Sequence, residues 1–135
     1  MLLYFIRHGQ TDWNKDMRMQ GQSDIPLNEN GRESAIEAGK TLANTHIDLA
    51  FSSPLKRAKE TAELVLAGRD IPIIEDKRIE EIFFGICEGM RGRDENGQPV
   101  GCFAEFFAHP EQYKAPENGE DVKICLLYTS PSPRD

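Results

Sequence analysis

The sequence predicts an α/β fold built on a mostly parallel sheet. Apolar runs of strand length at residues 2–6, 47–52 and 71–74 alternate with two segments whose apolar residues recur at helical spacing. Such alternation is typical of βαβ units joined by right-handed crossovers. The 135 residues suffice for one ordinary domain, and 39% hydrophobic with 29% charged residues is a composition that supports a folded core.

The first strand is predicted from five consecutive apolar or aromatic residues at 2–6, which favour a strand buried on both faces. It runs directly into Arg7, His8 and Gly9. Open α/β sheets place their ligand crevice at the carboxyl ends of strands. A guanidinium fork fits phosphate geometry, neutral imidazole is a competent nucleophile, and glycine allows close backbone approach. The pattern points to an oxyanion site, and a basic pair closing a strand is the plainer alternative.

Residues 12–27 follow neither a helical nor a strand period and are rich in polar and turn residues. They are therefore predicted to form a loop that walls the site. The side-chain amides of Asn14 and Gln20 can donate to a phosphate, and Gly21 can add a backbone N–H. Solvated polar loop residues are the alternative for all three.

A helix is predicted to begin near Glu29, because Asn28 is a good N-cap residue. Its buried stripe is expected to be apolar residues at helical spacing, and the helix is expected to be structural. These residues are Ala35, Ile36, Leu42 and Ala43.

A second helix is predicted after the strand at 47–52, with Ser53 as its cap and Pro54 at its first position. Arg57 then lies in the first turn of this helix, at the carboxyl end of a strand. The helix dipole and the free amides of that turn favour an anion there. Lys56 and Lys59 compete with Arg57 for this role, but on an amphipathic helix they are expected to be solvated.

Acidic residues lie among apolar ones in the segment 78–89. A carboxyl group held against Phe83 and Phe84 would be desolvated and become a usable proton donor near neutral pH. The segment itself does not distinguish Glu80, Glu81 and Glu88, and ordinary surface carboxylates are the alternative.

The net charge of −7 argues against nucleic acid or an anionic membrane as partner, and leaves a small anionic substrate in a local basic pocket. Cys87, Cys102 and Cys125 are odd in number and lack a CxxC spacing. We therefore expect neither a disulfide framework nor a zinc site, and a reducing cytoplasmic compartment. The apolar start is interrupted by Arg7 and His8 too early for a signal peptide or a membrane span.

Four motifs, taken together and in order, resemble the histidine phosphatase superfamily (branch 1), the phosphoglycerate mutase-like enzymes. The resemblance covers roughly residues 1–122 and implies a three-layer αβα fold with a mostly parallel sheet. The motifs are Arg7-His8-Gly9-Gln10-Thr11 with Asn14; Pro26-Leu27 with Gly31; Ser52-Ser53-Pro54-Leu55 with Arg57-Ala58 and Thr61-Ala62; and Glu81 with Gly85 and Glu88-Gly89.

The resemblance implies phosphoryl transfer through a phosphohistidine on His8, without a metal or other cofactor. Arg7 and Arg57 would grip the phosphoryl oxygens, where charge accumulates in the transition state. By its motif position, Glu81 would protonate the leaving oxygen and then activate water. Asn14 resembles the substrate-contacting asparagine of the family. The expected substrate is a small phosphorylated metabolite.

The chain departs from the family at its C-terminal end. The family has a second histidine, in a His-Gly element that ends a later strand, and no histidine follows His109 here. The ending from Cys125 resembles translated adapter or assembly read-through. We therefore expect residues 1–122 to be a partial, incomplete domain and residues 123–135 a non-native tail. Such a chain is expected to be aggregation-prone and impaired in activity.

Two alternatives to a phosphomonoesterase stay open. A cofactor-dependent phosphoglycerate mutase would use the same phosphohistidine, although Gln10-Thr11 and the segment 84–89 look more like the phosphatase side. A non-catalytic module that binds a phosphate ligand would need Arg7 and Arg57, but neither His8 nor Glu81. The oligomeric state cannot be predicted from the sequence.

Overall fold

The structure is a computed structural model that describes residues 1–122. Its helices are α1 (Asp12–Lys15), α2 (Glu29–Thr41), α3 (Lys56–Val65) and α4 (Ala104–Ala108), and its strands are β1 (Ala50–Ser52) and β2 (Ile73–Glu75). The chain divides into two compact units. Unit 1 contains Met1–Asp12 and Asp24–Lys77, and unit 2 contains Trp13–Ser23 and, of the described residues, 78–122. The predicted tail lies outside the described residues.

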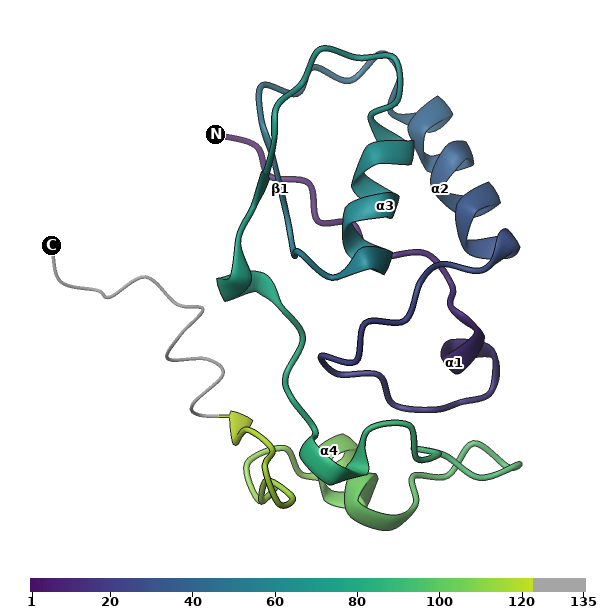
Figure 1. Ribbon diagram of the computed structural model, residues 1–135, viewed down its shortest axis with the longest axis vertical. Coiled ribbons are helices and arrows are strands. Elements are labelled where there is room, and N and C mark those ends of the chain that lie inside the picture. Colours follow the sequence, from purple (N-terminus) through teal and green to yellow (C-terminus); the bar gives the residue numbers. More distant parts are fainter. Residues whose placement is uncertain (123–135) are drawn as a thin grey trace, which may run out of the picture. The chain divides into compact units, whose positions relative to one another are not determined.

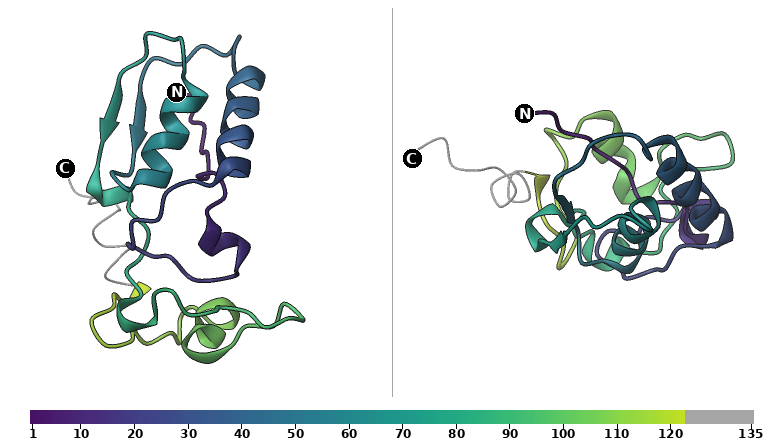
Figure 2. Two further views of the ribbon diagram at one scale, coloured as in Figure 1. Left: turned by 45° about the vertical axis from the view of Figure 1, so that its right-hand side comes forward. Right: turned by 90° about the horizontal axis from the view of Figure 1, so that it is seen from above.

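Unit 1 carries the βαβ unit that the sequence predicts. Strand β1 pairs in parallel with β2, so that Ala50 lies opposite Ile73 and Ser52 opposite Glu75. Helix α3 connects the two strands, and α2 lies beside α3 (Figures 1 and 2). The prediction of an α/β fold with a parallel sheet is therefore confirmed.

Helix α2 begins where the sequence predicts. The side chain of Asn28 accepts a hydrogen bond from the amide of Gly31 at 2.9 Å, which caps the first turn. The buried stripe differs from the expected one, because Ile36 is 43% exposed. It runs instead through Gly31 and Ala35 to the partly buried Ala38 and Leu42, toward Val65 and Leu66.

Helix α3 begins two residues later than predicted. Its N-cap is Leu55, which makes no side-chain capping bond. The hydroxyl of Ser53 instead accepts from the amide of Leu55 at 3.3 Å, so Ser53 and Pro54 form a turn before the helix. Arg57 still lies in the first turn of α3, as predicted.

The N-terminal segment corrects the prediction of a strand buried on both faces. Residues 2–6 form no strand and are exposed, Phe5 by 90%. A strand requires backbone partners on a neighbouring strand, and within residues 1–122 the sheet contains β1 and β2 alone. The apolar run is therefore strand-like in composition but has no strand to pair with in the described part of the chain.

The loop predicted for residues 12–27 contains one short helix, α1, of four residues. The rest of that stretch consists of turns and isolated bridges. None of the helices that the structure describes has the length and apolar character needed to cross a membrane.

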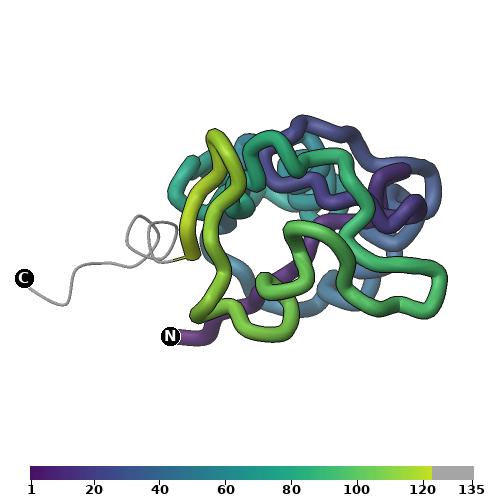
Figure 3. The backbone as a smooth tube through the Cα atoms, turned by 90° about the horizontal axis from the view of Figure 1, so that it is seen from below, coloured from purple at the N-terminus to yellow at the C-terminus, as the bar shows by residue number. Residues whose placement is uncertain are grey.

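Unit 2 is organised around an aromatic cluster rather than a sheet. Its buried members are Ile82, Phe84, Cys87, Phe103 and Tyr113. The rings of Phe84, Phe103, Phe106 and Tyr113 meet edge to face with centroids 5.1 to 5.2 Å apart. Figure 3 shows the backbone of residues 78–122, in green to yellow, winding through turns around short helical segments. The aromatic side chains therefore supply the core that holds these turns.

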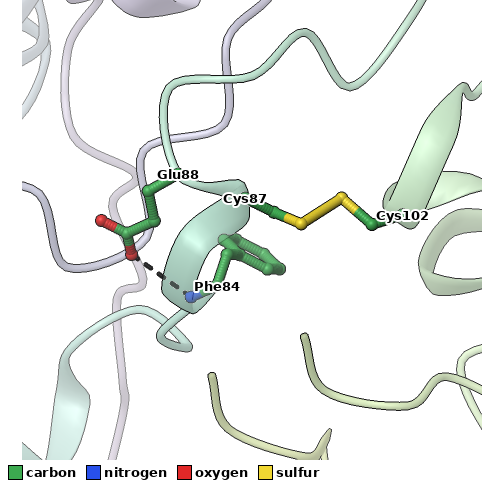
Figure 4. The surroundings of a disulfide bond; sticks show 4 residues. All are labelled: Phe84, Cys87, Glu88 and Cys102. Atoms are coloured by element: carbon green, nitrogen blue, oxygen red, sulfur yellow. Dashed lines mark hydrogen bonds between the residues drawn. A yellow bond between two sulfur atoms is a disulfide. The ribbon is translucent and has the colours of Figure 1, made fainter. Parts of the chain in front are cut away.

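A disulfide joins Cys87 to Cys102 in unit 2, although the sequence suggests no disulfide framework (Figure 4). The two cysteines are 15 residues apart and carry no local spacing motif. They meet because Cys87 is buried in the aromatic cluster, and Cys102 precedes another member of it, Phe103. Tertiary packing brings the pair together, and the spacing in the sequence does not reveal it.

Replacement of Cys102 by serine is expected to lower the free energy of unfolding of unit 2 by about 3 kcal/mol, because the disulfide closes a loop of this length. The single tryptophan, Trp13, belongs to unit 2 and reports its unfolding by fluorescence in a urea titration. Cys125→Ser, which leaves the pair intact, is the matched control. A reducing agent should shift the wild-type midpoint and leave the Cys102→Ser midpoint unchanged. Equal midpoints for oxidised and reduced wild type would contradict the prediction.

Candidate active site

The Arg-His-Gly segment is tied to helix α3 through Thr61. The amide of Gly9 donates to the Thr61 hydroxyl at 3.0 Å, and that hydroxyl donates to the carbonyl of Arg57 at 2.6 Å. Thr61 is one helical turn after Arg57 and is buried. A single hydroxyl therefore connects the backbone beside His8 to the backbone of Arg57.

The imidazole of His8 has a defined orientation. Its Nδ1 lies 2.7 Å from the carbonyl oxygen of Gly9. A carbonyl oxygen only accepts hydrogen bonds, so Nδ1 carries the proton in the neutral ring. In this tautomer the lone pair of the ring is on Nε2, and a nucleophilic histidine attacks with such a lone pair.

Close backbone packing explains two glycines of the motifs. A Cβ atom at Gly9 would lie 2.5 Å from the carbonyl oxygen of Gly31, and one at Gly31 would lie 2.2 Å from that of Gln10. The first turn of α2 therefore approaches the Arg-His-Gly segment more closely than any side chain would permit. A cavity of about 270 Å³ lies beside this contact, lined by residues 6–10 and by Ser34, Ala35, Ala38, Thr61 and Val65.

Arg57 is only 1% exposed, in contrast to the lysines next to it. Lys56 lies 3.8 Å from Asp24, and Lys59 forms an exposed ion pair with Glu75 at 2.5 Å. The hydrogen bond and charge of Glu75 raise the pKa of Lys59 above its ordinary value. The expectation that both lysines are solvated is confirmed, and of these three cations Arg57 is the buried one.

The remaining candidate residues belong to unit 2. Asn14 lies in α1, and Gln20 is buried. Gly21 has a φ of 50°, in the left-handed region that favours glycine. Arg7, His8 and Arg57 belong to unit 1, so the candidate residues are divided between the two units.

For Glu81, the structure corrects the hypothesis of a carboxyl group held against Phe83 and Phe84. It is exposed, and its Oε1 accepts from the amide of Ile82 at 3.0 Å. Phe84 turns into the aromatic cluster and is 2% exposed, so its ring covers other rings rather than the carboxylate. The backbone carbonyl of Glu81 accepts from the side chain of Gln22 at 3.2 Å.

The sequence predicts no role for Thr61, although the residue belongs to the same motif as Arg57. A signal was present, because the hydroxyl of a threonine four residues after Arg57 can donate to the carbonyl of Arg57.

The other two histidines are exposed. His46 lies 2.9 Å from Asp48, and His109 lies 3.5 Å from Glu111. In the described part of the chain, no three His, Cys, Asp or Glu side chains are grouped as a metal site requires.

Comparison with known proteins identifies the family. Residues 3–125 match the family model of the histidine phosphatase superfamily (branch 1). The chain belongs to this superfamily. Two solved histidine phosphatase neighbours superpose with a TM-score of 0.77 each. Bacillus stearothermophilus YhfR is 38% identical, covering 90% of this chain and 60% of that one. A putative alpha-ribazole-5'-P phosphatase from Escherichia coli is 30% identical, covering 91% and 60%.

Curated relatives in the histidine phosphatase superfamily carry two kinds of name. The uncharacterised phosphatase PhoE of Bacillus subtilis is 44% identical over 85 residues, covering 63% of this chain and 44% of the relative. A probable phosphoglycerate mutase, GpmB, of Cronobacter sakazakii is 38% identical over 114 residues, covering 73% and 52%. The chain thus spans about half the length of these relatives.

Proposed function

We propose that this chain carries the nucleophile of a phosphomonoesterase that hydrolyses a small phosphorylated metabolite through a phosphohistidine on His8. The observation that supports this most directly is the contact of His8 Nδ1 with the carbonyl oxygen of Gly9 at 2.7 Å, from which a lone pair on Nε2 follows. The link through Thr61, which joins the backbone beside His8 to that of Arg57, is consistent with a shared phosphate site.

In the first step, Nε2 of His8 forms a bond to phosphorus as the ester P–O bond breaks. Arg7 and Arg57 stabilise the negative charge on the phosphoryl oxygens. Glu81, which is exposed and takes this role from its motif position, gives its proton to the leaving oxygen, which departs as an alcohol. Asn14 donates to the substrate, and Gln20 with the backbone of Gly21 would add further donors.

In the second step, water attacks the phosphorus and the N–P bond breaks. Glu81, now a carboxylate, takes the proton from the water, so the enzyme returns to its starting protonation state. The products are inorganic phosphate and the alcohol. The net charge of −7 agrees with a substrate drawn to a local basic pocket rather than to a basic surface.

A phosphoglycerate mutase is the second candidate, because the relatives include proteins that carry that name. Such an enzyme would return the phosphoryl group of His8 to the substrate rather than to water. The Gln10-Thr11 pair and the segment 84–89, which look more like the phosphatase side, support hydrolysis.

The test is to incubate the 135-residue chain with 3-phosphoglycerate and a 2,3-bisphosphoglycerate primer, and separately with a panel of small phosphate esters. We expect inorganic phosphate to be released and no 2-phosphoglycerate to form. Because the family's second histidine is absent from this sequence, we expect slow release, and ³²P labelling of the protein provides a single-turnover measurement. Formation of 2-phosphoglycerate at a rate above phosphate release would favour the mutase.

A further inference from the structure

Glu88 has no role in the proposed reaction, yet its carboxylate accepts four hydrogen bonds within unit 2. Oε1 accepts from the amide of Gln22 at 2.7 Å. It also accepts from the amide of Phe84 at 3.2 Å (Figure 4). Oε2 accepts from the amide of Ser23 at 2.7 Å and from the Ser23 hydroxyl. One side chain therefore binds donors from two segments that are about sixty residues apart in the sequence.

These donors suit a carboxylate and no other side chain of this size. Every group around Glu88 in this set is an N–H or O–H donor, so both oxygens must accept. Hydrogen bonds to an ionised acceptor are roughly twice as strong as neutral ones. A glutamine would turn one oxygen into an NH₂ group that faces the same donors, which would leave at least one of them unsatisfied.

The loop packs directly onto this carboxylate at Gly21. A Cβ atom at Gly21 would lie 1.9 Å from Oε1 of Glu88 and 2.9 Å from the carbonyl oxygen of Ile82. Gly21 also has a φ of 50°. Both the space and the backbone conformation therefore require glycine here, and the carboxylate defines the space.

The residues after Glu88 hold the other end of the same loop. The amide of Gly89 donates to the carbonyl of Met19 at 2.8 Å, and the amide of Met19 donates to the carbonyl of Met90 at 3.0 Å. The side chain of Gln22 in turn donates to the carbonyl of Glu81. Residues 19–23 are thus fixed at both ends to the segment that carries Glu81.

We propose that Glu88 is a positioning residue that fixes the loop of Gln20 and Gly21 in register with the Glu81 segment, so that the loop meets the substrate preformed. The proposal rests on the proposed function for the substrate-binding role of that loop. Glu88 itself touches neither the substrate nor the reacting atoms. Its effect is on how tightly substrate binds, with little effect on the chemical step.

The test compares the full chain with its Glu88→Gln variant and with Glu95→Gln, an exposed carboxylate of the same unit, as the matched control. Amide hydrogen exchange should show protection at Gln22, Ser23 and Phe84 falling at least about tenfold in Glu88→Gln. The amide of Phe103, which bonds to Val100, should keep its protection. Glu95→Gln should match the wild type at all four.

The second measurement is ³²P labelling of the chain by an aryl phosphate over a range of concentrations. Glu88→Gln should raise the concentration for half-maximal labelling about tenfold and change the rate at saturation by less than about threefold. If Glu88→Gln loses protection throughout unit 2, Ser23→Ala decides. That variant removes only the hydroxyl donor and leaves Glu88 its three amide donors, so a rise in half-saturation of about two- to threefold is then expected.

Two outcomes overturn the proposal. One is unchanged exchange at Gln22, Ser23 and Phe84 in Glu88→Gln. The other is lost protection with no change in half-saturation. Absence of any label on the wild-type chain is a different result, because it contradicts the proposed function itself. The exchange data alone then decide whether Glu88 fixes the loop.

Discussion

Replacement of His8 by alanine is expected to abolish the ³²P-phosphohistidine label and to lower phosphate release by at least about 10⁴-fold. The ring whose Nδ1 lies on the Gly9 carbonyl is the proposed nucleophile, and alanine leaves no atom to form the N–P bond. The measurement is autoradiography of the protein after incubation with a labelled aryl phosphate, with the label tested for the alkali stability and acid lability of a phosphohistidine.

His46→Ala and His109→Ala are the matched controls for this experiment. Both histidines are exposed and paired with nearby carboxylates, so each variant should label like the wild type. A His8→Ala chain that still labels would contradict the phosphohistidine. A non-catalytic binding module makes a different prediction, because its His8→Ala variant should keep most of its affinity for phosphate.

Arg57→Lys is expected to lower the rate of labelling by about 10² to 10³-fold, the loss typical of removing one preorganised donor from a developing oxyanion. The guanidinium presents a planar fork that two phosphoryl oxygens can accept from, whereas an ammonium is a point charge on a flexible stem. Because Arg57 is only 1% exposed, a lysine at this position would be enclosed by the same neighbours and could not shift to make up for its different shape.

Lys56→Ala tests whether the effect is specific to Arg57 rather than to positive charge at the start of α3. Lys56 is exposed and lies 3.8 Å from Asp24. Because a surface ion pair contributes little, we expect Lys56→Ala to change the rate of labelling by less than about twofold. Circular dichroism of both variants checks that α2 and α3 persist. Labelling of Arg57→Lys at the wild-type rate would show that Arg57 is not part of the phosphate site.

Much of unit 1 could be predicted from the sequence because its signals are local. Asn28 caps α2 through a bond to an amide three residues away, and α3 follows β1 as the change from a strand run to helical spacing predicts. Arg57 was distinguishable from Lys56 and Lys59 by its motif position, and burial supports the same choice. Such signals act over a few residues, which a sequence pattern records directly.

The predictions that failed depend on partners far away in the chain. Residues 2–6 have the composition of a buried strand, but a strand needs a neighbour with which to exchange backbone hydrogen bonds. Glu81 is exposed, and Phe84 packs among other rings, which come from distant positions such as Phe103. The pairing of Cys87 with Cys102 followed from the same aromatic cluster.

The sequence by itself determined the α/β class, the parallel βαβ unit, the family and the order of the candidate residues, because motifs and periodicity are properties of neighbouring residues. Only the tertiary structure decided that Thr61 links Gly9 to Arg57 and that Glu88 binds the loop of residues 19–23. The contacts of Gly9 with Thr61 and of Glu88 with the loop join residues more than fifty positions apart, and their hydrogen-bond geometry exists only once the chain has folded.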